Sequence, residues 1–123
     1  MTNENSHIPQ KIYIGASWPY ANGNIHIGHL AGQYVVCDIF ARYHRLKGNK
    51  VLLVSGSDSH GAPVVFKAEQ EGITPEQMAK QAHDQIVSTY KKLGLLYDNY
   101  TRTTTEIHKE VAQNIFLVLK ENG

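Results

Sequence analysis

The stretch KIYIGASWPYANGNIHIGHL, at positions 11–30, decides the fold because it contains the passage from a strand into a helix. Apolar residues recur at every second position within Lys11–Trp18, which predicts a strand with one apolar side. Pro19 and the Asn22-Gly23 pair are strong turn signals and predict a loop after that strand. Apolar residues then recur at helical spacing, which predicts a long helix over about 25–47.

The remainder of the chain alternates in the same way between strand and helix patterns. The sequence predicts strands over Lys50–Gly56 and Tyr97–Thr103, and helices over 62–71, 75–93 and from Thr104 or Thr105 to the end. This order is typical of an α/β layer fold with a parallel sheet. We expect the chain to be half of a larger doubly wound domain; the alternative is a small sheet that folds alone.

Two local patterns refine this prediction. Val51-Leu52-Leu53-Val54 is a continuous apolar run, which favours a strand covered on both faces. Thr74, Pro75 and Gln77 have the spacing of a helix start, with Thr74 as the N-cap and Gln77 as its capping-box partner.

Composition narrows the classes of protein to consider. The 123 residues include 41% hydrophobic and 19% charged residues with a net charge of +1, so extensive disorder and a broadly basic nucleic-acid coat are both disfavoured. Cys37 is the one cysteine, which excludes a disulfide framework and a cysteine-rich zinc cluster within this chain. Residues 1–10 are a polar tail without an apolar signal core, and no apolar run is long enough to cross a membrane. We therefore expect a reducing cytoplasm and no membrane partner.

The helix start after the first strand carries the candidate chemistry. Ligands of open α/β sheets bind beyond the carboxyl ends of the strands, and a helix N-terminus there suits phosphate. His26 and His29 are three residues apart, so both can face one side and donate to phosphate oxygens, and protonation would strengthen those bonds. Gly28 leaves room for a base or ribose, and Gly23 gives the loop backbone freedom. The alternatives are a surface pair, or two metal ligands with His60 as the third.

Asp58 follows the second strand and is predicted to lie near the same crevice. A carboxylate in that position is a reasonable partner for an ammonium group. The alternative is structural, because Ser57, Asp58 or Ser59 could each cap the helix that follows.

Several motifs together resemble one known family. His26-Ile27-Gly28-His29 matches the HIGH signature of class I aminoacyl-tRNA synthetases. The flanking stretches WPYANG (18–23), ARYHRLKG (41–48) and GSDSHGAP (56–63) extend the match. Residues 13–123 resemble the N-terminal part of the methionyl-tRNA synthetase family; the leucyl, isoleucyl and valyl families are the nearest alternatives.

The resemblance implies a fold and a role for each matched residue. Residues 11–123 would form the first half of a Rossmann-like, doubly wound nucleotide-binding domain and end near a connective insertion. His26 and His29 would be catalytic and contact the ATP phosphates. The other implied contacts are Gly28, Asn22 and Gly23 with ATP, and Ser17, Trp18, Tyr20 and Asp58 with methionine.

The resemblance also implies a reaction and its participants. The carboxylate of methionine would attack the α-phosphorus of ATP to give methionyl-adenylate and pyrophosphate, and the methionyl group would then pass to tRNA(Met). ATP would enter with Mg²⁺, and no zinc site is expected within this chain.

One family signature is missing from these residues. No KMSKS-like segment occurs in the sequence. We therefore expect the remaining half of the catalytic domain on the same or another chain, and a fragment that is not competent alone. The alternative is a free-standing truncated paralogue that binds a nucleotide or an amino acid.

Overall fold

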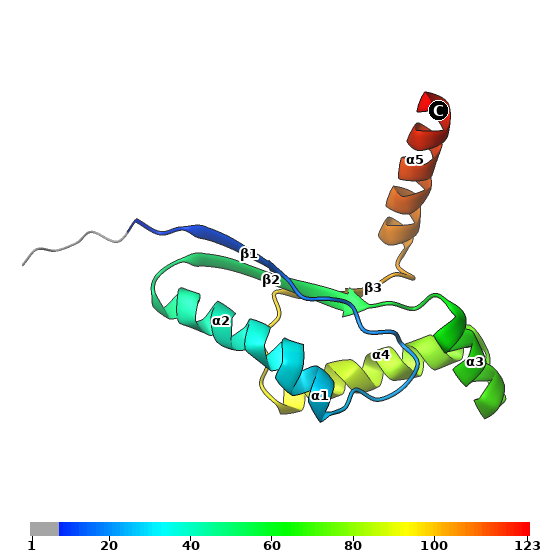
Figure 1. The fold of residues 1–123 in the computed structure, drawn as a ribbon, viewed down its shortest axis with the longest axis horizontal. Helices are drawn as coiled ribbons and strands as arrows, with labels where there is room; N and C mark the ends of the chain where they lie inside the picture. Colours follow the sequence, from blue (N-terminus) through cyan, green and yellow to red (C-terminus); the bar gives the residue numbers. More distant parts are fainter. Residues whose placement is uncertain (1–7) are drawn as a thin grey trace, which may run out of the picture.

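The computed structural model describes residues 8–123 and has an α/β architecture with a three-stranded sheet (Figure 1). Residues 1–7 of the predicted tail lie outside the described part, and residues 8–10 are exposed coil. The elements are β1 (Lys11–Gly15), α1 (Ile27–His29), the π-helical turn η1 (Leu30–Tyr34), α2 (Val35–Leu46), β2 (Lys50–Ser57), α3 (Ala62–Glu71), α4 (Pro75–Lys92), β3 (Asn99–Arg102) and α5 (Glu106–Asn122).

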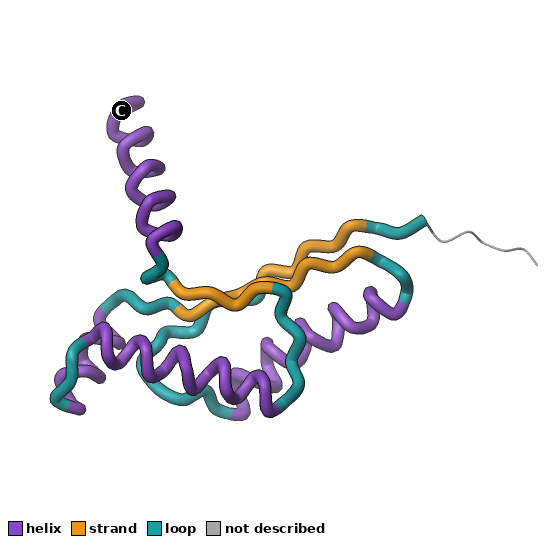
Figure 2. The backbone as a smooth tube through the Cα atoms, turned by 180° about the vertical axis from the view of Figure 1, so that it is seen from behind, coloured by secondary structure: helices purple, strands orange, loops and turns teal. Residues whose placement is uncertain are grey.

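The three strands are parallel and lie in the order β1-β2-β3, which confirms the predicted parallel sheet. Helices α2 and α4 lie on the same side of this sheet (Figure 2). Residues Ile12, Ile14 and Ala16 are at least half-buried on that side, and Leu53 is fully buried. Because the three strands are parallel, their carboxyl ends lie at the same edge of the sheet.

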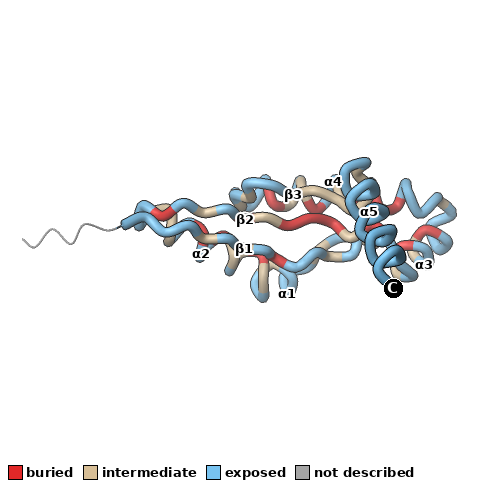
Figure 3. Tube along the Cα trace, turned by 90° about the horizontal axis from the view of Figure 1, so that it is seen from above, coloured by how far each residue is buried: buried red, intermediate tan, exposed pale blue. Residues whose placement is uncertain are grey.

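The opposite face of the sheet is open, and the prediction that β2 is covered on both faces is wrong for the described residues. Tyr13 is 71% exposed and Leu52 is 49% exposed, whereas the buried part of the sheet follows β2 toward its carboxyl end (Figure 3). Residue alternation explains the difference, because Leu52 and Leu53 point to opposite faces and the described helices α2 and α4 cover only one of them.

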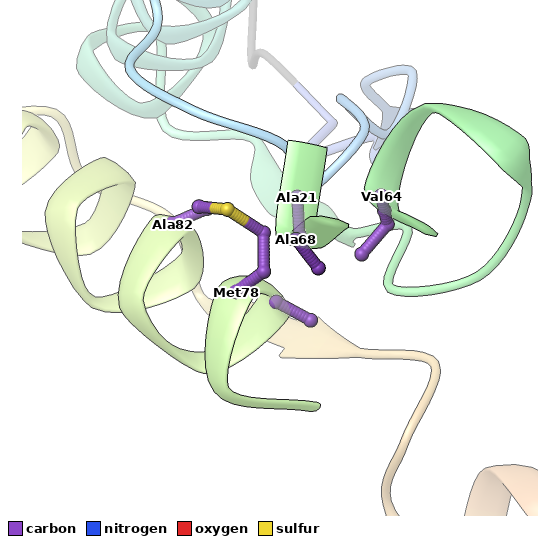
Figure 4. Close-up of a cluster of buried hydrophobic side chains, with 6 residues drawn as sticks. Ala21, Val64, Ala68, Met78 and Ala82 are labelled. Carbon is purple, nitrogen blue, oxygen red and sulfur yellow. The ribbon is translucent and has the colours of Figure 1, made fainter. Parts of the chain in front are cut away.

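The first core cluster fixes the loop that follows β1. Ala21 of that loop has no exposed surface and packs where α3 and α4 meet (Figure 4). Its neighbours in the cluster are Val64, Ala68, Met78, Ala79 and Ala82. The loop on either side of Ala21 is therefore held against the helices, although most of its other residues are partly or fully exposed.

The second core cluster is rich in tyrosine and joins α4 to the sheet. Tyr34, Tyr97 and Tyr100 surround Tyr90, with ring centroids 5.2–5.4 Å from that of Tyr90. Burial raises the pKa of Tyr100 to about 12 and raises that of Tyr34 as well. These tyrosines act as apolar packing groups.

Several element boundaries differ from the prediction. The first strand ends at Gly15 rather than Trp18, and the third spans Asn99–Arg102 rather than Tyr97–Thr103. The first helix begins at Ile27 rather than near residue 25, and a π-helical turn interrupts it. Helices α3 and α4 follow the prediction closely, and Thr105 rather than Thr104 caps α5.

Helix α5 projects away from the face of the sheet that α2 and α4 cover (Figure 1). Every residue of α5 is exposed, including the apolar series Ile107, Val111, Ile115 and Leu119. None of the helices within residues 8–123 combines the length and apolar character that a membrane crossing requires.

Candidate functional site

The site lies where β1 and β2 end. Beyond the sheet, Tyr20 and Asp58 form an isolated parallel bridge. The N–H of Asp58 donates to the carbonyl of Pro19 at 2.8 Å, and the N–H of Ala21 donates to the carbonyl of Asp58 at 2.7 Å. These two bonds hold the loop after β1 against the turn after β2, so residues from both segments share one edge.

A cavity of about 400 Å³ opens beside this bridge. It brings together six of the predicted site residues, namely Ser17, Trp18, Tyr20, Asn22, Gly23 and His29. His26, Gly28 and Asp58 are not among its lining residues, although His26 is in ring contact with His29. The loop and the first turn of the helix therefore form one continuous surface.

His26 and His29 cap the helix reciprocally. The Nδ1 of His26 accepts from the N–H of Gly28 at 3.1 Å, and the Nδ1 of His29 accepts from the N–H of His26 at 3.3 Å. The two rings are stacked, with centroids 3.9 Å apart. Both side chains are thus oriented by the backbone of the same turn.

This arrangement determines which nitrogen can reach a ligand. A Nδ1 that accepts a hydrogen bond carries no proton, so each ring in this pattern holds its proton on Nε2 and presents an Nε2–H donor. In each ring, Nδ1 thus holds the helix start and Nε2 is left for a ligand.

Two glycines allow close approaches at the site. A Cβ on Gly28 would lie 3.0 Å from the ring of His26, so Gly28 makes room for the capping ring itself. A Cβ on Gly56 would lie 2.7 Å from the Trp18 ring and 2.8 Å from the carbonyl oxygen of Thr101. The absence of a side chain at Gly56 lets the indole of Trp18 lie directly on β2.

Asp58 does not cap the helix that follows it, and neither do Ser57 or Ser59. The N-cap of α3 is Gly61, and no side chain caps this helix. One carboxylate oxygen of Asp58, Oδ1, accepts from the N–H of His60 at 3.1 Å. Its other oxygen has no hydrogen-bond partner among residues 8–123, so Asp58 is oriented and retains one free acceptor.

The sequence argument missed Gln33. Its side-chain amide donates to the hydroxyl of Ser17 and lines the same cavity. Gln33 is four residues after His29, so helical spacing could have placed it on the same side as the histidines. It ties the end of β1 to the first turns of the helix.

The metal-site alternative requires His60 to join His26 and His29 as a third ligand. Within residues 8–123, no group of three or more histidine, cysteine, aspartate or glutamate side chains is close enough to hold a metal ion. His60 is thus not grouped with His26 and His29.

Together, the parallel sheet and the cavity at its carboxyl ends are those of a Rossmann-like α/β domain. The family model described as "tRNA synthetases class I (M)" matches residues 12–123, and the chain belongs to that family.

Curated relatives agree with this assignment. The chain is 51% identical over 116 residues to a protein named methionine–tRNA ligase in Thermomicrobium roseum, covering 94% of this chain and 20% of the relative. It is also 51% identical over 114 residues to the protein of the same name in Dehalococcoides mccartyi strain BAV1, covering 93% and 21%. The chain spans about a fifth of the length of the curated relatives it matches.

Solved structures share the fold. A leucyl-tRNA synthetase of Agrobacterium radiobacter, in a ternary complex with tRNA and LeuAMS, matches 98% of this chain and 16% of its own, with a TM-score of 0.88 and 30% identity. The methionyl-tRNA synthetase of Mycobacterium tuberculosis, in complex with methionyl-adenylate, matches 82% and 20%, with a TM-score of 0.78 and 29% identity. The backbone is thus similar to synthetases for two amino acids, whereas the curated relatives named above are methionine–tRNA ligases.

Proposed function

We propose that this chain is the nucleotide-binding part of a methionine–tRNA ligase, which activates methionine with ATP and transfers it to tRNA. The observation that carries the proposal is the histidine pair at the start of α1. Both Nδ1 atoms are held by backbone N–H groups, so both Nε2–H groups are free to donate outward. The relatives named methionine–tRNA ligase support the choice of amino acid.

In the proposed reaction, the methionine carboxylate attacks the α-phosphorus of ATP, and the bond from that phosphorus to the bridging oxygen of pyrophosphate breaks. Negative charge grows on the phosphate oxygens during this step. His26 and His29 would stabilise that charge by donating from Nε2, as fixed donors do in other active sites. No protein nucleophile is required, because the main tasks are positioning and charge stabilisation.

The residues at the ends of β1 and β2 would receive the remaining groups. The free carboxylate oxygen of Asp58 would accept a charge-assisted hydrogen bond from the α-ammonium group of methionine. Trp18 and Tyr20 would enclose the amino acid, and Ser17, held by Gln33, would complete that wall. Asn22, Gly23 and Gly28 would adjoin ATP.

The wider proposal concerns partners beyond these residues. We expect ATP to enter as its Mg²⁺ complex, tRNA(Met) to accept the methionyl group, and the remaining half of the catalytic domain to complete the site. We place the protein in the cytoplasm.

Methionine-dependent ATP–pyrophosphate exchange, measured on the full-length protein, tests this function. The informative variant is His26→Asn, because the asparagine oxygen can keep the N-cap whereas the Nε2–H is lost. We expect exchange to slow by roughly 10²-fold or more if the donor stabilises the transition state. Unchanged exchange in both His26→Ala and His29→Ala would overturn the assignment.

A matched control separates catalysis from helix stability. Thr74→Ala removes a reciprocal cap of the same design at the start of α4, away from the histidines. We expect this variant to lose stability and to keep its exchange rate at permissive temperature. If Thr74→Ala slowed exchange as much as His26→Asn, the histidine effect would be structural.

A further inference from the structure

A second cavity, of about 440 Å³, opens beyond the ends of β2 and β3. It is separate from the cavity that His29 lines, and the two share no lining residue. Its charged or titratable lining residues are His60, Lys80, Arg102 and Lys109, with Glu76 as the one acidic member. Its lining is therefore predominantly cationic, in a chain whose net charge is only +1.

Arg102 is the central feature of this cavity. It is the last residue of β3 and is half-buried, yet its guanidinium has no hydrogen bond or ion pair with any described residue. An arginine fork is well matched to the oxygens of a phosphate group, which it can bind with two parallel hydrogen bonds. The guanidinium is thus available for a ligand.

Ser59 provides a second, independent observation. This residue lines the same cavity and is only 7% exposed, and its buried hydroxyl has no hydrogen-bond partner among residues 8–123. A buried hydroxyl without a partner costs free energy, so a ligand oxygen that accepted from it would remove a penalty. A phosphate group has several acceptor oxygens, and Ser59 and Arg102 line the same cavity, so both would be potential donors to it.

The two lysines can add charge without losing strong partners. Lys80 pairs with Asp84 at 2.6 Å and Lys109 pairs with Glu106 at 2.9 Å, and all four side chains are more than half exposed. Exposed pairs of this kind contribute little stability, so either lysine can turn to a ligand at small cost. The first turns of α4 and α5 also meet this cavity and add the positive ends of two helix dipoles.

His83 of α4 lies near two of these cations. Burial lowers its pKa most, the charges of Arg102 and Lys80 lower it further, and that of Asp84 raises it.

We propose that the cavity bounded by Ser59, Lys80, Arg102 and Lys109 binds a phosphate group, supplied either by the backbone of an RNA or by free inorganic phosphate. This inference does not depend on the proposed function, because none of these residues belongs to the candidate ATP or methionine site. It adds a second anion site to the same edge of the sheet, beyond Asp58.

Calorimetric titration of the full-length protein with inorganic phosphate tests the site. The background carries His26→Ala and His29→Ala, so that the candidate ATP contacts do not contribute. In this background we expect Arg102→Gln to weaken phosphate binding about tenfold and Lys80→Gln to weaken it about threefold. Lys92→Gln is the matched control, because it removes the same charge at the far end of α4.

A second titration identifies the source of the phosphate. A fluorescently labelled single-stranded RNA of twelve nucleotides is added to the same variants at one fixed salt concentration. Parallel losses for RNA and phosphate support the backbone source, and a loss for phosphate alone supports the free ion. The proposal is overturned if Arg102→Gln and Lys80→Gln bind phosphate as the background does, or if Lys92→Gln weakens it equally.

Discussion

The start of α1 and the start of α4 use the same capping design with different side chains. At α4, the hydroxyl of Thr74 accepts from the N–H of Gln77 at 3.2 Å, and the Gln77 side chain accepts from the N–H of Thr74 at 3.0 Å. At α1, His26 and His29 exchange the equivalent bonds with the backbone. The two helix starts therefore differ in whether the capping side chain keeps a second polar atom that can bind a ligand.

Thr74 and Gln77 use their capping atoms for stability, and neither residue lines either cavity at the strand ends. An imidazole has a second nitrogen, so His26 and His29 can cap with Nδ1 and bind with Nε2. The helix they begin is also less regular, because α1 has three residues before the π-helical turn η1, whereas α4 continues for eighteen. Irregular turns of this kind are frequent at functional sites.

The largest expected effect comes from exchanging one cap for the other. The double variant His26→Thr, His29→Gln installs the α4 design at α1 and removes both Nε2–H donors. We expect the helix to persist, as judged by circular dichroism, and ATP–pyrophosphate exchange to fall by roughly 10²-fold or more. Retained exchange would mean that the two helix starts are equivalent and would break the comparison.

A smaller effect is expected at Asp58, which forms a bridge with Tyr20 in the loop that leads to α1. Asp58→Ala should weaken methionine binding about tenfold and affect ATP binding much less, because a charge-assisted bond to the ammonium is lost. Separate titrations with methionine and with ATP measure the split. Equal loss of both ligands would instead indicate a structural role in the bridge with Tyr20.

At the α4 start, the expected effect is on stability alone. Thr74→Ala should lower the free energy of unfolding by about 1 kcal/mol, the usual cost of losing an N-cap. Urea unfolding measures this loss, and Thr74→Ser, which keeps the hydroxyl, is the control. A loss from Thr74→Ser as large as that from Thr74→Ala would show that the hydroxyl is not the source of the stability.

The smallest effect concerns His83, the half-buried histidine of α4. Its Nδ1 lies 3.0 Å from the hydroxyl of Ser57, and burial is the main cause of its lowered pKa. The unfolded chain binds a proton near pH 6.5, whereas the folded chain resists it. The contribution of His83 to the free energy of unfolding is therefore fully present above about pH 6.5, and it is lost as the pH falls toward the lowered pKa of His83 in the folded state.

Urea unfolding at about pH 7.5 and about pH 5.5 measures this contribution. We expect His83→Gln to reduce the loss of stability between the two values, and His108→Gln, at an exposed position, to leave it unchanged. If both variants kept the full loss, other groups would account for the acid sensitivity.

The elements with strong local signals could be predicted from the sequence. Thr74 and Gln77 fix the start of α4 through their own hydrogen bonds, and Gly72 ends α3 at the predicted residue in a left-handed conformation. The end of β1 could not be predicted, because it depends on pairing with β2. That pairing stops at Gly15 and Val54, after which the chain departs and Trp18 packs over Gly56.

The sequence predicted which residues belong to the candidate site better than it predicted how their side chains are arranged. Six predicted residues line one cavity, because Ala21 anchors the loop after β1 against the helices. The orientation of the two histidines was not predictable, since it depends on backbone N–H groups that their own rings cap. Helical spacing places Gln33 on the side of the histidines, but its contact with Ser17 depends on tertiary packing. The bond from the N–H of His60 to Asp58 is local, because the two residues are two positions apart.

The contact between Trp18 and Gly56 also has an optical consequence. Trp18 is the single tryptophan in a sequence with seven tyrosines, and its indole is 38% exposed at the rim of the cavity where methionine is proposed to bind. Light at the red edge of the tyrosine absorption excites this indole and leaves the buried tyrosine cluster silent. A molecule that enters the cavity displaces water from the indole ring. The wavelength of the Trp18 fluorescence therefore changes when the cavity is occupied.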